Sequence, residues 1–319
     1  MRKNQALFRA PTPPVSPHAD EQGTRLRRHL RDFAERSGKG RLALRLADRP
    51  GGEVARGEGH FHLVPELFLQ VAGWTLFRFP QGELHLGPGE ALLLPPRLLH
   101  AERVGQADSG EPFCNLVVYA EAGTLSCHLA HETAPGRPGI LYLETSRHAQ
   151  AARIHDWLAE AAQLGEPGDG HAAASRWAAA QLRSLVAAAT IGALRALDDP
   201  QDPAQPREPA PIARVRVLVQ NQLGDPALSV RHLAAHVGCT PDYLSHLFAR
   251  TTGEHLAAFI VRQRMERAAH LLGKSEMAGK EIAWACGFAT ASYFTRSFRT
   301  HFGLTPKAWR AAAGGSPPA

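Results

Sequence analysis

SVRHLAAHVGCTPDYLSHLFARTTG (residues 229–253) and KEIAWACGFATASYFTRSFRTHFG (residues 280–303) are the two stretches that decide the fold of the C-terminal third. Each begins with a short amphipathic segment, passes through a glycine turn, and continues into a second segment that stops at a glycine. Leu244 and Phe294 hold equivalent places in them, 50 residues apart. This repetition predicts two helix-turn-helix units in tandem.

Residue types at the segment boundaries support this prediction. Ser229, Thr240 and Thr290 have the hydroxyl side chains that cap helix N-termini. Gly238 stands where the turn of the first unit needs a permissive backbone. Residues 260–272 are expected to form a long helix that joins the two units.

The second helix of each unit has one apolar face and one polar face. The apolar positions, which are expected to pack inward, are Leu244, Leu247, Phe248, Tyr293, Phe294 and Phe298. A helix fits the major groove of DNA, where each base pair presents a distinct pattern of donors and acceptors. Two such helices held side by side would enter successive grooves about 34 Å apart.

The charge of the chain is concentrated in the same region. The 319 residues, enough for two domains, carry a formal net charge of +6. Residues 212–310 contain 13 Lys and Arg against 6 Asp and Glu, whereas the rest of the chain is nearly neutral. A basic domain attached to a neutral one is typical of proteins that bind nucleic acid.

The stretches LSVRHLAAHVGCTPDYLSHLFARTTG and KEIAWACGFATASYFTRSFRTHFGLTPKAWR resemble the DNA-binding domain of the AraC/XylS family of transcription regulators. The resemblance implies binding to double-stranded promoter DNA and contact with RNA polymerase, as an activator more often than a repressor. By position it assigns the following base-edge readers: Asp242, Ser245, His246, Ala291, Ser292, Thr295 and Arg296. It assigns phosphate contacts to Arg250 and Arg299.

One residue departs from this family pattern. Gly279 stands where a branched apolar residue is usual, at the entry to the second unit. Glycine costs roughly 1 kcal/mol relative to alanine inside a helix. The first helix of the second unit is therefore expected to start late or to fray.

Residues 41–119 have a different pattern. Apolar and polar residues alternate in WTLFRF (residues 74–79) and ELHL (residues 83–86), and Gly and Pro interrupt the pattern at short intervals. Short alternating strands with close turns are typical of an antiparallel barrel or sandwich. Residues 24–36, ahead of this region, are expected to form a short amphipathic helix.

A set of candidate metal ligands lies in this β region. His60, His62 and Glu66 form an H-x-H-x3-E pattern, and His100 follows on a later strand or loop. On a strand, residues at even spacings share one face, so the first three can point inward together. Imidazole and carboxylate groups suit a divalent metal such as zinc, iron, manganese or nickel. The alternative is that the histidines line a pocket without binding metal.

This arrangement resembles the two sequence motifs of the cupin superfamily. The resemblance implies a cupin-like barrel that binds a small-molecule effector, which is a common partner of the AraC-type module. Val54 and Arg97 replace glycines of the motifs, and Val104 replaces an asparagine, so the differences concern the turns more than the ligands. His85 is expected at the surface rather than among the ligands.

Two helical segments, residues 147–164 and 171–197, follow the β region and are separated by the breaker cluster GEPGDG. They predict an antiparallel helix pair. An apolar stripe on the second segment is expected both to pack on the barrel and to contribute to the seam of a homodimer: Leu182, Leu185, Val186, Ala189 and Leu194. Residues 199–211 hold five prolines and are expected to be a linker.

The remaining composition favours a cytoplasmic protein. Four widely spaced cysteines, without a CxxC pair, fit a reducing compartment. The Ala-rich stretch at residues 178–197 is interrupted by Arg183 and Arg195, so we expect no membrane span. The N-terminus lacks the apolar core of a signal peptide.

The sequence thus predicts a multidomain α+β chain. Its expected parts are a disordered N-terminus (1–23), a cupin-like sensor barrel (24–145), a helical hairpin (146–198), a linker (199–211), an all-α AraC-type domain (212–311) and a tail (312–319). The expected function is a ligand-controlled transcription regulator that is not an enzyme. The alternative is a metal-dependent cupin enzyme fused to a DNA-binding module.

Overall fold

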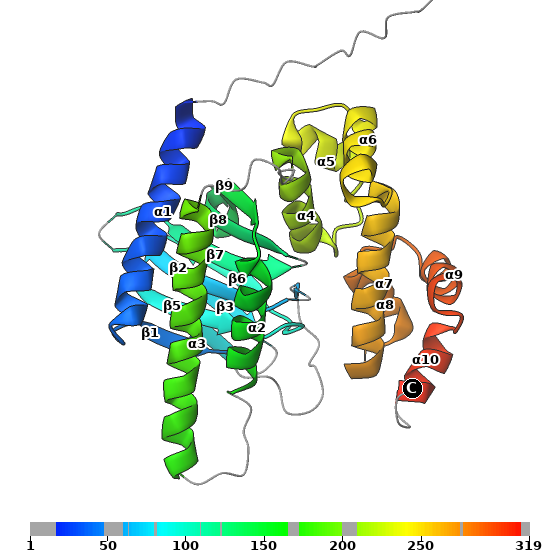
Figure 1. Ribbon diagram of the computed structural model, residues 1–319. Helices are drawn as coiled ribbons and strands as arrows, with labels where there is room; N and C mark the ends of the chain where they lie inside the picture. The colour runs from blue at the N-terminus through cyan, green and yellow to red at the C-terminus, as the bar shows by residue number, and fades with distance from the viewer. Residues whose placement is uncertain are drawn as a thin grey trace, which may run out of the picture.

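The computed structural model describes residues 17–47, 60–62, 64–79, 82–108, 110–121, 123–164, 172–199, 209–274 and 277–313. A β domain with three covering helices lies beside an all-helical C-terminal domain (Figure 1). The multidomain α+β class expected from the sequence is therefore confirmed. The position Val54 and most of the linker lie outside the described residues.

The strands of the β domain form two sheets. One has the order β1-β5-β2-β7-β8-β9 and the other the order β4-β3-β6. Neighbours are antiparallel except β1 and β5, which are parallel. Of the antiparallel barrel or sandwich that the sequence predicted, the described strands thus match the sandwich, since they pair as two sheets that share a core. The bounds are β1 (Ala43–Leu46), β2 (Glu66–Ala72), β3 (Trp74–Phe79), β4 (Gly82–Leu86), β5 (Glu90–Leu94), β6 (Ala101–Gly105), β7 (Cys114–Glu121), β8 (Thr124–Ala134) and β9 (Arg137–Arg147).

The inner strands of the larger sheet are buried on both faces because their side chains alternate between two cores. Leu67 and Leu69 of β2 pack against the helices, whereas Phe68 between them packs against Phe77 of the smaller sheet. The helices on the outer face are α1 (Pro17–Gly38), α2 (Gln150–Gln163) and α3 (Ala172–Asp198). The expectation that residues 1–23 are disordered is wrong for 17–23, since α1 already begins at Pro17.

Helix α3 carries the apolar stripe for which the sequence predicted two roles. Val186 and Ala189 are fully buried against the β-domain core, and Leu182, Leu185 and Leu194 pack against it in part. The packing interpretation is confirmed, and dimerisation stays a prediction. By length and composition alone, residues 176–198 pass as a possible membrane span, contrary to our expectation. One face of this helix packs against α1 and α2, and 28% of the apolar window is buried.

The C-terminal domain consists of helices around two hydrophobic cores. One core joins α4, α5 and α6 with the start of α7, and the other joins the rest of α7 with α8, α9 and α10. The bounds are α4 (Ala210–Gln222), α5 (Val230–Val237), α6 (Pro241–Thr252), α7 (Leu256–Lys274), α8 (Gly279–Ala285), α9 (Ala291–Phe302) and α10 (Pro306–Ala313). Helix α7 is the long joining helix predicted from the sequence.

The predicted caps are confirmed. The hydroxyl oxygens of Ser229, Thr240 and Thr290 accept hydrogen bonds from backbone amides at the starts of α5, α6 and α9. Gly238 has a φ of 72°, as the turn requires. Gly279 is the first residue of α8, so the helix begins at the departing residue rather than after it.

Each of the two domains buries side chains in the core of the other. Phe61 and Leu99 of the β domain are buried in the second core of the C-terminal domain. In the opposite direction, Val217 of α4 is buried in the core of the β domain. Gln220 Nε2 also donates a hydrogen bond of 3.3 Å to Glu121 Oε2. The boundary is thus a packed interface.

Candidate nucleic-acid interface and histidine cavity

Helices α6 and α9 present the residues predicted to read base edges. The polar face of α6 exposes Asp242 and His246, with Ser245 half-buried. The equivalent face of α9 exposes Ser292, Thr295 and Arg296, with Ala291 half-buried. The predicted phosphate contacts, Arg250 and Arg299, are exposed in the last turns of the same helices. The fold therefore leaves all nine candidates on outward faces.

Two hydroxyl groups in these faces are already engaged within their own helices. Ser245 Oγ donates to the Pro241 carbonyl at 2.8 Å, and Thr295 Oγ1 donates to the Ala291 carbonyl at 2.9 Å. Because each hydroxyl hydrogen is already used in one of these bonds, the two groups can offer only acceptor lone pairs to a base edge. Arg296 carries the strongest donor group of the α9 face.

Sequence reasoning missed two aromatic residues on this surface. Tyr243 of α6 is 55% exposed and Tyr293 of α9 is 53% exposed. The prediction that Tyr293 packs inward is wrong, since Phe294 takes the buried position and the Tyr293 ring lies 6.0 Å from that of Phe288 at the surface. The 50-residue repeat would have revealed the pair, because Tyr243 and Tyr293 hold equivalent places.

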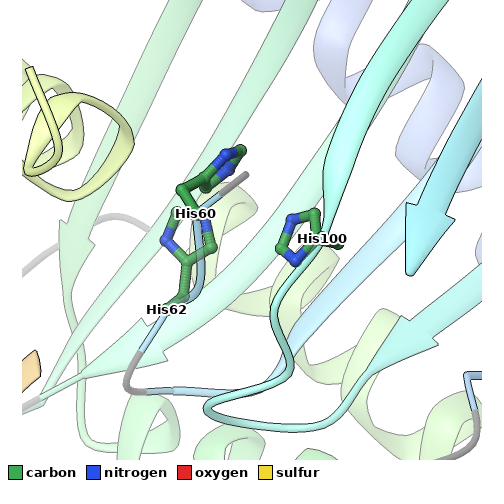
Figure 2. A group of neighbouring side chains, drawn as sticks. All are labelled: His60, His62 and His100. Carbon is green, nitrogen blue, oxygen red and sulfur yellow. The ribbon is translucent and has the colours of Figure 1, made fainter. Parts of the chain in front are cut away.

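Three of the four predicted metal ligands come together in the β domain. His60 and His100 exchange backbone hydrogen bonds of 2.8 and 2.9 Å in an isolated bridge, which brings their side chains to one side. The candidate ligand nitrogens of His60, His62 and His100 all lie within 4.8 Å of one another. Figure 2 shows the three rings gathered between the two chain segments.

Two carboxyl groups accompany the histidines. Glu66, the fourth predicted ligand, has its Oε2 3.3 Å from Nε2 of His62. Glu102 was not predicted, yet its Oε1 lies 3.8 Å from His60 Nε2 and 3.9 Å from His100 Nε2. It follows His100 by two residues at the start of β6, so the even spacing was the signal that could have identified it. His85 is exposed and stacks on Trp74, as expected.

Burial determines the protonation of this cluster. It lowers the pKa of His60 and His62 well below the usual value, and the neighbouring His100 lowers them further. It lowers the pKa of His100 to about 4 and raises that of Glu102 to about 7. The imidazoles are therefore neutral at pH 7, which is the form that binds metal.

A cavity of about 230 Å³ opens beside the cluster. Its β-domain wall includes His60 and Glu102 as well as Asn115 and His128 of β7 and β8. The remaining wall comes from the C-terminal domain, where α4 contributes two side chains, Leu218 and Gln222. Gln222 Oε1 also lies 3.0 Å from His232 Nε2 of α5, within the first helix-turn-helix unit.

Comparisons with known proteins place similarity in the C-terminal domain. A family model described as a helix-turn-helix domain matches residues 233–312. The transcriptional regulatory protein YesN of Bacillus subtilis (strain 168) is 34% identical over 110 residues, which cover 34% of this chain and 30% of that protein. The HTH-type transcriptional activator RhaR of Cronobacter sakazakii is 31% identical over 86 residues, covering 27% and 30%.

One solved structure is also similar to a part of this chain. The structure of a transcriptional regulator with an AraC-type DNA-binding domain from Chromobacterium violaceum is 28% identical, with a TM-score of 0.31, and covers 33% of this chain and 93% of that one. For the two relatives above, the match spans less than half of their own length.

Proposed function

We propose, starting from the AraC-type helix-turn-helix domain that this chain carries at residues 233–312, that the whole protein is a sequence-specific transcription regulator. Its DNA target is double-stranded. The observation that carries the proposal is the pair of outward polar faces on α6 and α9, each in a capped helix-turn-helix unit. The basic excess of residues 212–310 attracts the phosphate backbone to these faces.

The shared cavity supports control by a small-molecule effector. Its wall combines β-domain residues with Leu218 and Gln222 of α4, so a bound molecule would touch both domains. A ligand shifts a conformational equilibrium only by its differential affinity for the states. A molecule that contacts both walls favours the docked arrangement, and in this way the effector governs how the two units are held. On this basis we propose that the β domain acts as a cupin-like sensor that binds the effector.

The residues around the cavity also suit a divalent metal, and we propose one as part of the effector site. His62 Nδ1 and His100 Nε2 are buried and have no hydrogen-bond partner among the described residues. Unpaired imidazole nitrogens beside two buried carboxyl groups are the donors that zinc, iron, manganese or nickel would use. When bound, the metal would supply a Lewis-acidic centre that holds an oxygen atom of the effector.

Three further features belong to the same proposal. RhaR, which matches this chain in part, is named a transcriptional activator, and we propose activation through contact with RNA polymerase. We propose a homodimer that uses the outer face of α3, where Trp177 and Ile191 are exposed. We propose a cytoplasmic location because the target is promoter DNA.

The enzyme alternative receives no support from the matched proteins, which are named as regulators. We therefore propose a protein that is not an enzyme, with the histidine cluster serving regulation.

Selection from a randomised duplex library, with the full chain as bait, tests the proposal. We expect enrichment of an asymmetric site with two blocks of specified bases about one helical turn apart, since α6 and α9 would read successive grooves. Recovery of duplexes without any shared sequence would overturn it.

A further inference from the structure

The two nitrogens of His62 have different surroundings. Its Nε2 lies 3.3 Å from Oε2 of Glu66, and both side chains are 5% exposed. Its Nδ1 is buried without a hydrogen-bond partner among the described residues. A metal-bound histidine typically directs its second nitrogen to a carboxylate, which fixes the tautomer and the ring orientation. Glu66 Oε2 is itself buried without a hydrogen-bond partner among the described residues, so at 3.3 Å it is available for this outer place, and Nδ1 is left for a ligand.

The tautomer of His100 is fixed in a similar way. Its Nδ1 donates to the Leu98 carbonyl at 2.9 Å, because a carbonyl oxygen can only accept. The proton therefore resides on Nδ1 and the lone pair on Nε2. That Nε2 atom has no hydrogen-bond partner among the described residues, and the His100 side chain is 1% exposed.

Glu102 is placed differently from Glu66. One of its oxygens, Oε1, faces the Nε2 atoms of both His60 and His100, at 3.8 and 3.9 Å. Ligand atoms about 2.1 Å from a tetrahedral zinc ion are separated by roughly 3.4 Å from one another. The two observed distances are therefore close to those of ligands that share one ion, whereas they exceed hydrogen-bond length.

We propose that the site takes a divalent cation bound by His60, His62, His100 and Glu102, with Glu66 outside as the residue that orients His62. This inference rests on the metal proposed above and deepens it. It differs from the ligand set expected from the cupin resemblance, in which Glu66 is a ligand and Glu102 has no role.

Calorimetric titration of the full chain with Zn²⁺ alone separates the two carboxylates. We expect Glu102→Gln to weaken Zn²⁺ binding at least 100-fold, since a ligand is lost, and Glu66→Gln to weaken it 10- to 100-fold. The absorption spectrum of the Co²⁺-loaded protein gives an independent readout. Its visible bands should change in Glu102→Gln and keep their shape in Glu66→Gln, because only the first substitution alters the coordinating atoms.

Circular dichroism verifies that each variant is folded. If Glu102→Gln does not fold, Glu102→Asp provides the comparison, because the shorter carboxylate keeps the charge and moves the oxygen. A changed spectrum in Glu66→Gln with an unchanged one in the Glu102 variant would overturn the assignment. So would a wild-type chain that does not bind Zn²⁺. Binding of the metal-free chain to library-selected DNA, measured in the same preparations, reports separately on the proposed function.

Discussion

At the scale of single residues, Arg97 shows the conformational strain that arises where another residue replaces a motif glycine. It stands where the cupin resemblance expects glycine, and it is the one non-glycine residue with positive φ, 67°, in the described part of the chain. Its backbone amide donates to the His62 carbonyl at 2.7 Å, so the strained turn supports the histidine cluster. A left-handed conformation costs a residue with a Cβ atom about 1–2 kcal/mol.

Arg97→Gly should therefore raise the free energy of unfolding by up to about 1 kcal/mol, because relief of the strain exceeds the added entropy of the unfolded chain. Urea unfolding of the metal-free chain measures the difference. Arg41→Gly is the matched control, since Arg41 is also exposed but does not have a positive φ. The control should gain no stability, and an equal gain in both variants would contradict the explanation.

Arg296 and Arg299 are the residues proposed to make the two kinds of DNA contact, to a base edge and to a phosphate. Arg296→Ala should cost about 1–3 kcal/mol of binding free energy and relax specificity at one base pair. Arg299→Ala should weaken binding evenly across sequences and reduce the salt dependence by about one phosphate contact. Fluorescence anisotropy with single-base variants of the selected duplex, at several salt concentrations, measures both. Indistinguishable profiles for the two variants would remove the assigned roles.

Residue types and spacing predicted part of each site. They singled out His60, His62 and His100, which the structure brings together, but not Glu102, which lies beside them. The role of Glu102 depends on where the bridge between His60 and His100 directs β6. Helical spacing likewise placed Phe294 correctly and Tyr293 incorrectly, since Phe294 is 1% exposed and Tyr293 is 53% exposed.

At the scale of elements, the turn of the second unit is more constrained than that of the first. Gly287 has a φ of 73°, and a Cβ there would lie 2.5 Å from the Leu223 carbonyl oxygen at the end of α4. Gly238 has a nearly equal φ of 72°, yet a Cβ there would meet nothing within 4 Å. The glycine in the second turn is therefore needed for close approach as well as for conformation.

Gly287→Ala should lower the free energy of unfolding by about 2–4 kcal/mol, because strain and a backbone clash add. Gly238→Ala, the matched control, should cost only about 1–2 kcal/mol from conformation. Chemical unfolding curves provide the comparison. Equal losses would mean that the contact between α4 and the second turn is not maintained in solution.

Phe61 connects the histidine segment to the second helix-turn-helix unit. It is 3% exposed, its ring lies 5.2 Å from that of His270, and it packs with Met265 and Phe294 in one core. Its neighbours in the chain are His60 and His62. One short segment therefore contains two candidate metal ligands and an aromatic side chain that packs in the core of the C-terminal domain.

Phe61→Ala should destabilise the chain by about 3–5 kcal/mol and speed amide hydrogen exchange in α7 and α8. Phe113→Ala is the matched control, since Phe113 is also 3% exposed but lies in a small cluster inside the β domain. Its cost should be similar without faster exchange in α7 and α8. Exchange that rises equally in both variants would show that Phe61 has no special link to the second unit.

Helices with a capping residue in the sequence were predicted well, whereas the ends of other elements were not. The caps Ser229, Thr240 and Thr290 fix where helices begin, so α5, α6 and α9 match the expectation. Helix α1 begins earlier than predicted, and the elements that it packs against, α3 and β9, lie far along the sequence. The pairing of strands in two sheets depends on such distant partners too.

At the scale of the whole molecule, the boundary between the domains is the feature that the sequence could not reveal. The proline-rich segment predicted two tethered, sterically separate domains. The structure instead buries Val217 of α4 in the β domain and Phe61 in the C-terminal domain. A residue pattern shows which face of an element is apolar, but it does not show which distant face will cover it.

This arrangement predicts that metal and stability are linked across the molecule. Zn²⁺ at 100 times its dissociation constant should stabilise the folded chain by about 2.7 kcal/mol, and EDTA should reverse the effect. Thermal unfolding with and without the metal measures the shift. The variant His100→Gln, which lacks one proposed ligand, should show no shift, and an unchanged response in it would exclude the histidine cluster as the origin.

The central claim is that one chain reads a specific DNA site with two helix-turn-helix units. Its most direct test is the ratio of affinities of the full chain for the selected duplex and for a scrambled duplex of equal length at physiological salt. The account predicts a ratio of at least about 10³, in the range of specific DNA-binding proteins. Equal affinities for the two duplexes would contradict it.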